Sequence, residues 1–105
     1  MSLHGVSVAR TCFSRADGVR LRGAMDLATA SRLTTMLDAA IRESRGAFVI
    51  DLCDVTFLDS SAINLLVGVH HLCQTNGGHL ALASPTGATR RALEICCVDL
   101  ELTII

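Results

Sequence analysis

The sequence contains no lysine, tryptophan or tyrosine, and each absence excludes a kind of chemistry. All nine basic residues are arginine, so the chain lacks a lysine for a Schiff base or for a phosphate-binding loop of the GxxxxGK[ST] type. Only 3% of the residues are aromatic, and the formal net charge is -1. A surface that stacks nucleic-acid bases needs aromatic or arginine planes in a basic groove. We therefore expect no nucleic acid among the partners of this protein.

Long apolar runs and cysteine pairs with metal-binding spacing are also missing. No apolar stretch approaches the roughly 20 residues that a membrane helix needs, and the opening residues MSLHGVSVAR do not resemble a signal peptide. The five cysteines are odd in number and form no CxxC motif, which is typical of reduced thiols packed as small apolar groups. His70 and Cys73 lie three residues apart, but no second pair completes a metal site. We expect a cytoplasmic protein without membrane insertion, metal or other cofactor.

The apolar content of the chain is sufficient for one compact core. Half of the 105 residues are apolar, so residues 1–105 are predicted to form a single domain, with residues 1–4 disordered or an artificial extension. Alternating apolar and polar residues predict a β-hairpin over 6–13 and 18–25, around the turn sequence SRADG.

The rest of the chain alternates between helical and extended patterns. Apolar residues recur at helical spacing in three segments, and short apolar runs lie between them. The order β-β-α-β-α-β-α-β indicates an α/β fold with a mixed sheet and an internal parallel part. After the hairpin we predict a helix from an N-cap at Thr29 to a stop at Gly46, a strand over 47–52 buried on both faces, and a loop over 53–59. A second helix, which Gly77 terminates, and a strand over 79–84 follow. The last predicted elements are a helix with Ser84 as N-cap and Pro85 at its first position, and a strand over 100–105.

Two serines lie at the start of the second predicted helix, in the sequence VTFLDSSAINLLVGV (residues 55–69). Asp59 or Ser60 can cap this helix, because the side-chain oxygens accept hydrogen bonds from free N–H groups. A nucleophilic role has little support, since the G-x-S-x-G elbow is absent and His70 lies about 15 Å along the same helix. Phosphorylation is a third interpretation, because a helix N-terminus accommodates an anion. A phosphate would add about -1.5 to -2 charges beside Asp59.

Three stretches of the sequence point to a known family. VIDLCDVTFLDSSAINLLVG combines a buried-strand pattern with Asp-Ser-Ser and an apolar helix, and LRGAMDLATASRL combines a Gly-x-x-Asp segment with a Thr-Ala helix start. LALASPTGATRRALEI has a strand, Ser-Pro and a helix in succession. Together they resemble the STAS domain family, and especially the bacterial anti-sigma factor antagonists, in order over nearly the whole chain. The resemblance implies an α/β, STAS-like mixed sheet of four or five strands with helices packed mainly on one face.

The resemblance also implies a function. In antagonists of this kind the first serine after the aspartate accepts a phosphate, and Ser60 matches that position. The partner would be an anti-sigma factor that is itself an ATP-dependent serine kinase. Binding of the unphosphorylated protein to this kinase would release the sigma factor, and a separate serine phosphatase would reset the switch. The protein would be a monomer or weak dimer and not an enzyme. The expected partner-binding surface comprises Asp26, Asp59, Ser60, Ser61, Ala62 and Asn64.

Three features depart from the pattern of the family, one of which is that CCVDLELTII lacks the usual glycine after the third helix. Ala62 stands where glycine is usual, which is expected to place a Cβ against the partner, and Ala24 replaces the usual glutamate. A second hypothesis is therefore an unphosphorylated STAS subunit of a lipid ABC-type transporter or of a stress-signalling complex. A small thiol or serine enzyme is a third hypothesis, with the least support from the residues.

Overall fold

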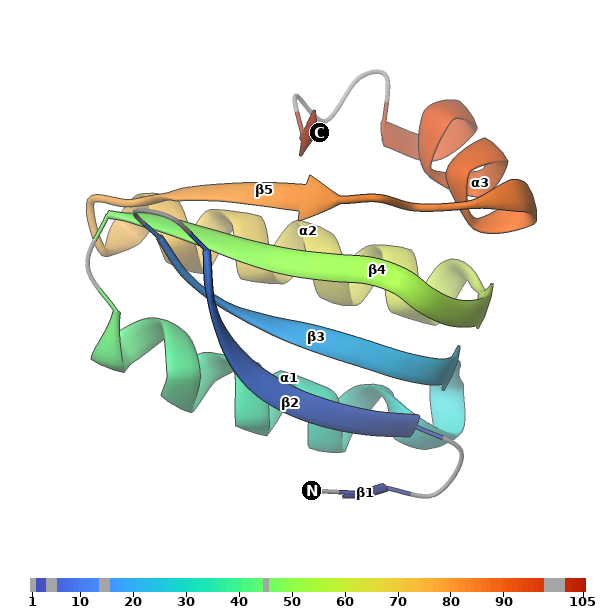
Figure 1. Cartoon of the computed structure of the whole chain (residues 1–105), viewed down its shortest axis with the longest axis horizontal. Helices are drawn as coiled ribbons and strands as arrows, with labels where there is room; N and C mark the ends of the chain where they lie inside the picture. Colours follow the sequence, from blue (N-terminus) through green and yellow to red (C-terminus); the bar gives the residue numbers. More distant parts are fainter. Residues whose placement is uncertain (1, 4–5, 14–15, 45, 98–101) are drawn as a thin grey trace.

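A six-stranded sheet and three helices make up the part of the chain that the structure describes (Figure 1). The computed structural model describes residues 2–3, 6–13, 16–44, 46–97 and 102–105. The elements are β1 (Ser2–Leu3), β2 (Val6–Phe13), β3 (Ala16–Met25), α1 (Leu27–Glu43), β4 (Ala47–Leu58), α2 (Ser60–Thr75), β5 (His79–Ala83), α3 (Gly87–Cys97) and β6 (Thr103–Ile104).

The strands lie in the sheet in the same order as in the sequence. β1, β2 and β3 are antiparallel neighbours, whereas β3, β4, β5 and β6 are parallel, with one helix between each successive pair. α1 and α2 cover one face of the sheet, and α3 lies beyond the C-terminal end of β5 (Figure 1), where it contacts β4. The predicted mixed sheet, with helices mainly on one face, is confirmed. Because β3, β4 and β5 run in the same direction, all three helices begin at the same end of the molecule, on the right in Figure 1.

Several predicted boundaries differ from those in the structure. The second hairpin strand begins two residues earlier than predicted, and the short strand β1 was not predicted. α3 begins at Gly87 and not at Pro85, and Ser84 is not its N-cap. The first helical hydrogen bonds, from the N–H groups of Thr89 and Arg90, go to the carbonyl oxygen of Thr86 at 3.1 and 3.3 Å, whereas Ser84 has a φ of 55°. Parts of three predicted segments lie outside the described residues: 1 and 4, the turn residues 14–15, and 100–101 of the last strand.

The N-cap of α1 is Asp26, and the prediction of Thr29 was wrong. The carboxylate of Asp26 accepts a hydrogen bond from the Thr29 N–H at 3.2 Å, and the Thr29 hydroxyl accepts one from the Asp26 N–H at 3.2 Å. This reciprocal pair is a capping box, in which the third helical residue reaches back to the cap. Thr29 is thus buried inside the first turn.

Strand β4 continues through the segment that was predicted to be a loop. Its pairing with β3 contains two irregularities: Arg20 pairs with Asp51 but Arg22 with Asp54, and later Gly23 pairs with Val55 but Ala24 with Phe57. At each place β4 has one residue more than β3, which is a β-bulge. The bulges shift which side chains point inward. Leu52, Val55 and Leu58 are buried, whereas Cys53, Asp54, Thr56 and Phe57 are exposed.

The main core lies between the sheet and the helices. The predicted apolar stripe of α2 is confirmed. Its members are all buried except Leu72, which is half-buried; the buried ones are Ala62, Leu65, Leu66, Val69 and Cys73. β4 is buried from Phe48 to Leu52, as predicted, with Val49 packed beside Ala81 and Ala83 in a separate group. The largest side chains that are fully buried are Phe48, Leu21, Met25, Leu33, Leu37, Ile41, Ile50, Leu52, Leu66, Leu80, Leu82 and Leu93.

Candidate functional site

Two strand-to-helix junctions lie side by side at the end of the molecule where the helices begin. Met25, the last residue of β3, pairs with Leu58, the last residue of β4. The N–H of Asp59 donates to the carbonyl oxygen of Met25 at 3.2 Å, which joins the second junction to the first. Asp26 and Asp59 therefore follow paired residues and occupy equivalent places before α1 and α2.

Each of these aspartates caps a helix. The carboxylate of Asp59 accepts a hydrogen bond from the Ala62 N–H at 3.1 Å, as that of Asp26 does from Thr29. Of the two caps considered for α2, Asp59 is therefore the one observed, and Ser60 is the first helical residue. Both aspartates are half-buried, so each carboxylate stabilises the fold and also adds negative charge to this end of the molecule.

The serine and asparagine side chains of the first turns of α2 face the surface to different degrees. Ser60 and Asn64 are exposed, and Ser61 is half-buried. Ala62 was expected on the partner-binding surface, but only 1% of it is exposed. The third residue of a helix that packs on a sheet points toward that sheet when the first points away, because successive residues are separated by about 100°. The Cβ of Ala62 therefore lies in the core and does not face a partner.

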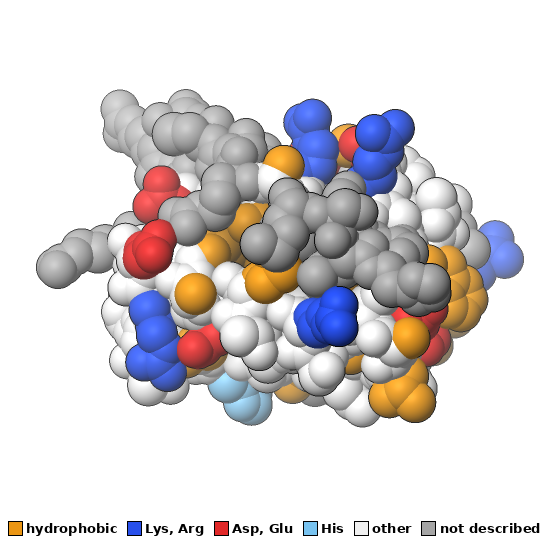
Figure 2. Space-filling view, turned by 90° about the horizontal axis from the view of Figure 1, so that it is seen from below, with side chains coloured by type: hydrophobic (Ala, Val, Ile, Leu, Met, Phe, Trp, Pro, Cys, Tyr) orange, Lys and Arg blue, Asp and Glu red, His pale blue; other side chains and the backbone are white. Residues whose placement is uncertain are grey.

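Two exposed hydrophobic side chains near this site were not predicted. Leu27 is 76% exposed and Phe57 is 53% exposed. Leu27 is the first residue of α1, as Ser60 is of α2. Hydrophobic side chains gather at the right-hand end of Figure 2, the end at which β3 and β4 finish in Figure 1. The only feature of the sequence that could have indicated the exposure of Leu27 is its place at the first position of a helix. The exposure of Phe57 depends on the bulges in β4.

The junctions expose the Ser60 hydroxyl, and the acidic residues beside it, Asp26 and Asp59, both cap helices. The residues around them, 24–29 and 57–64, include neither histidine nor cysteine. His70 is buried in α2 about ten residues, or roughly 15 Å, beyond Ser60. Among the described residues, no group of three or more His, Cys, Asp or Glu side chains could hold a metal ion. In the same part of the chain, none of the helices is both long and apolar enough to cross a membrane.

A polar network lies on the face of the sheet away from α1 and α2. Arg20 Nε donates to Asp51 Oδ2 at 3.0 Å, and the Cys53 N–H donates to Asp51 Oδ1 at 2.9 Å. Burial alone would raise the pKa of Asp51, but the hydrogen bonds from Cys53 and Arg20 outweigh it and hold the pKa below its ordinary value of 3.8. The hydrogen bond to Asp51 raises the pKa of the exposed Cys53 thiol.

These shifts bear on the cysteines, which were predicted to be reduced thiols packed as small apolar groups. Cys73 is buried as predicted, whereas Cys53 is exposed, so the prediction of packing was wrong for Cys53. Burial raises the pKa of the Cys73 thiol to about 11, and the pKa of Cys53 is raised as well. A thiol with a raised pKa holds little of the nucleophilic thiolate at neutral pH. The side chains of Cys12, Cys96 and Cys97 lie outside the described part of the structure.

Basic and acidic side chains are interspersed over the face in Figure 2, without a large region of one sign.

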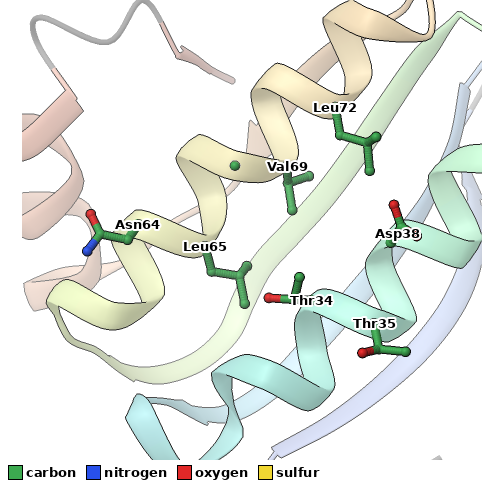
Figure 3. A pocket seen from close by; sticks show the side chains of 8 residues that line it. Thr34, Thr35, Asp38, Asn64, Leu65, Val69 and Leu72 are labelled. Carbon is green, nitrogen blue, oxygen red and sulfur yellow. The ribbon is translucent and has the colours of Figure 1, made fainter.

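A groove of about 510 Å³ runs between α1 and α2, starting near the Ser60 end. Figure 3 shows Leu65, Val69 and Leu72 pointing from α2 toward α1. Thr34, Thr35 and Asp38 line the α1 side, and Asn64 and Gly68 complete the α2 side. Asp38 Oδ2 lies 2.9 Å from Arg42 Nε, one turn further along α1. The groove thus has an apolar wall and a wall of hydroxyls.

Comparisons with known proteins identify the family of this chain. The chain belongs to the STAS domain family, whose family model matches residues 15–105. The anti-sigma F factor antagonist of Paenibacillus polymyxa is 30% identical to it over 78 residues, which are 73% of this chain and 67% of that protein. The resemblance to the family is therefore confirmed.

Solved structures show the same fold. The crystal structure of an anti-sigma factor antagonist from Mycobacterium paratuberculosis has a TM-score of 0.82 and 24% identity, over 94% of this chain and 84% of that one. The antagonist SpoIIAA in its unphosphorylated form has a TM-score of 0.76 and 17% identity, over 94% and 88% of the two chains. The phosphorylated form of the Bacillus SpoIIAA has a TM-score of 0.68 and 17% identity, over 94% and 91%. At these identities the likeness concerns the fold.

Proposed function

We propose that this protein is an anti-sigma factor antagonist whose binding is switched off by phosphorylation of Ser60. In the unphosphorylated state it binds an anti-sigma factor, so that the sigma factor is released. The anti-sigma factor is a serine kinase that uses ATP to phosphorylate Ser60, and a separate phosphatase removes the phosphate. The protein itself is a binding module and not an enzyme. The relative from Paenibacillus polymyxa, which is an anti-sigma F factor antagonist, supports this assignment.

The observation that carries the proposal is the position of Ser60 at the start of α2. Ser60 is exposed, and the capping oxygen of this helix comes from Asp59. A kinase can therefore reach the hydroxyl, and a phosphate on it removes no hydrogen bond from the cap. The helix N-terminus also favours the added charge through its dipole and its N–H groups. SpoIIAA, which shares the fold, exists in a phosphorylated and an unphosphorylated form.

The charge at this end of the molecule explains how the switch would act. Asp26 and Asp59 already contribute two carboxylates, and a phosphate adds about -1.5 to -2 charges beside them. A partner that docks on the unmodified surface would then face bulk and charge that it does not match. Misplaced charges at an interface cost several kcal/mol. A penalty of about 3–5 kcal/mol corresponds to a loss of affinity of roughly 10²–10⁴.

The experiment is a kinase assay with purified protein. The protein is incubated with ATP and each kinase-type anti-sigma factor from the same genome, and added phosphate is located by mass spectrometry. We expect phosphate on Ser60 that is absent from Ser60→Ala, whereas Ser61→Ala, the matched control at the half-buried neighbouring serine, is still modified. No phosphate on Ser60 with any of these kinases, together with co-purification with a transporter ATPase, would contradict the proposal and favour a constitutive transporter subunit.

A further inference from the structure

Exposed hydrophobic side chains concentrate at the Ser60 end of the molecule. In the described part of the chain four large hydrophobic residues are exposed, and the two that flank the junctions are Leu27 at 76% and Phe57 at 53%. Phe57 is the second-to-last residue of β4, two positions before Asp59, and Leu27 directly follows Asp26. Single exposed apolar residues are common on protein surfaces. These two lie at the same end of the molecule as the proposed modification site, where a docked partner can cover exposed apolar side chains.

Leu27 has a direct structural relation to Ser60. The two residues are the first positions of α1 and α2, and both helices follow strands that end side by side. The hydrogen bond from the Asp59 N–H to the Met25 oxygen, at 3.2 Å, keeps these junctions together. A protein that contacts the Ser60 hydroxyl therefore docks at the end of the molecule where Leu27 is exposed. Covering Leu27 removes its apolar surface from water, which favours binding.

The groove between α1 and α2 continues this surface, and Gly68 keeps it open. Gly68 is exposed in the middle of α2, although glycine is among the poorest helix formers. A Cβ at Gly68 would meet no atom within 4 Å, so the packing of this chain does not require glycine there. Asn64, which lines the groove, lies one turn beyond Ser60. The groove is thus continuous with the proposed docking surface, and its glycine leaves room for an atom from outside the chain.

We infer that the anti-sigma factor holds this protein through an apolar pocket that receives Leu27, and that its contact extends into the α1–α2 groove over Gly68. The inference rests on the proposed function and specifies its interface. The half-buried carboxylates of Asp26 and Asp59 flank the anchor, so the matching rim of the partner is basic. Phosphate on Ser60 would then add charge and bulk beside an apolar contact, which is where a docked interface tolerates it least.

The test measures binding of the anti-sigma factor that phosphorylates Ser60, in the presence of ADP, by titration calorimetry. Leu27→Ser should weaken binding by about 10-fold to 100-fold, which is the range for an anchor residue at an interface. Ile95→Ser is the matched control, because Ile95 is 73% exposed in the last turn of α3, which is not one of the two helices that begin at the junctions. Its affinity should stay within about twofold of the wild type. Gly68→Gln, which fills the groove, should weaken binding by at least about 10-fold.

Thermal unfolding separates these effects from misfolding. Leu27 and Gly68 are exposed, so both variants should keep the midpoint within about 3 °C of the wild type or raise it. Stable variants that bind like the wild type would overturn the inference and leave the proposed function intact. If no kinase-type anti-sigma factor binds or phosphorylates the wild-type protein, the proposed function is wrong and the inference is wrong with it.

Discussion

Gly78 offers a sharp test of the packing at the end of the molecule opposite Ser60. There the loop after α2 passes the loop after α1, and the His79 N–H donates to the Gly46 oxygen at 3.2 Å. The Gly78 N–H donates to the Cys73 oxygen at 2.7 Å. A Cβ at position 78 would overlap the Gly46 carbonyl oxygen and lie 3.4 Å from the Cys73 oxygen. Both are backbone atoms that cannot rotate away, so Gly78→Ala must displace one of the loops.

The expected cost follows from the contacts that such a displacement disturbs. Forcing a methyl group into a filled space costs about 1–3 kcal/mol. Each of the two backbone hydrogen bonds contributes about 0.5–1.5 kcal/mol and would be weakened or lost. We therefore expect Gly78→Ala to lower the free energy of unfolding by about 2–6 kcal/mol, a large part of the 5–15 kcal/mol typical of a domain.

Two other glycines provide matched controls for the same substitution, measured by urea unfolding. Gly77 has a φ of +77° and nothing within 4 Å of a Cβ, so Gly77→Ala should cost only the strain of the left-handed backbone, about 1–2 kcal/mol. Gly68 is helical and open, so Gly68→Ala should raise the free energy of unfolding by up to about 1 kcal/mol. If Gly78→Ala costs no more than Gly77→Ala, the steric argument is wrong.

Three further predictions concern the junction, the core and the sheet. Ser60→Asp should change the free energy of unfolding by less than about 1 kcal/mol, because an acidic residue is favourable in the first turn of a helix, yet it should abolish co-purification with the anti-sigma factor; loss of folding would mean that the hydroxyl is structural. Leu66→Ala should cost about 2–5 kcal/mol in urea unfolding, because Leu66 is 0% exposed and the change leaves a cavity; a cost below about 1 kcal/mol would contradict the packing described above. Because the pKa of Asp51 is lowered in the folded protein, the Asp51 carboxylate stabilises the fold at pH values above 3.8, its ordinary pKa. This contribution is lost as the pH falls through the lower folded pKa. Asp51→Asn should therefore lose less stability than the wild type between about pH 4 and pH 2, and equal losses in acid titrations would refute this origin.

Local patterns in the sequence were sufficient for the order of the elements from β2 onward and for much of the candidate site. The alternation in the hairpin and the apolar stripe of α2 depend on side chains a few residues apart, so their period is readable without a structure. The same holds for the cap of α2, because Asp59 and the N–H groups it serves lie within one turn. The local pattern gave the wrong N-cap for α1. The capping box has a polar side chain at each of two positions, Asp26 and Thr29, and the local pattern did not distinguish which of the two is the N-cap.

Only the tertiary structure decided which residues of the site face outward. The exposure of Phe57 depends on two bulges in β4, and the burial of Ala62 depends on how α2 packs on the sheet. The adjacency of Ser60 and Leu27, which are 33 positions apart, arises because Met25 and Leu58 pair across two strands. Strand register is set by long-range pairing and by the burial of one whole face, neither of which a short window of sequence contains. The sequence alone therefore determined that a hydroxyl begins α2, whereas the fold placed an exposed leucine beside it.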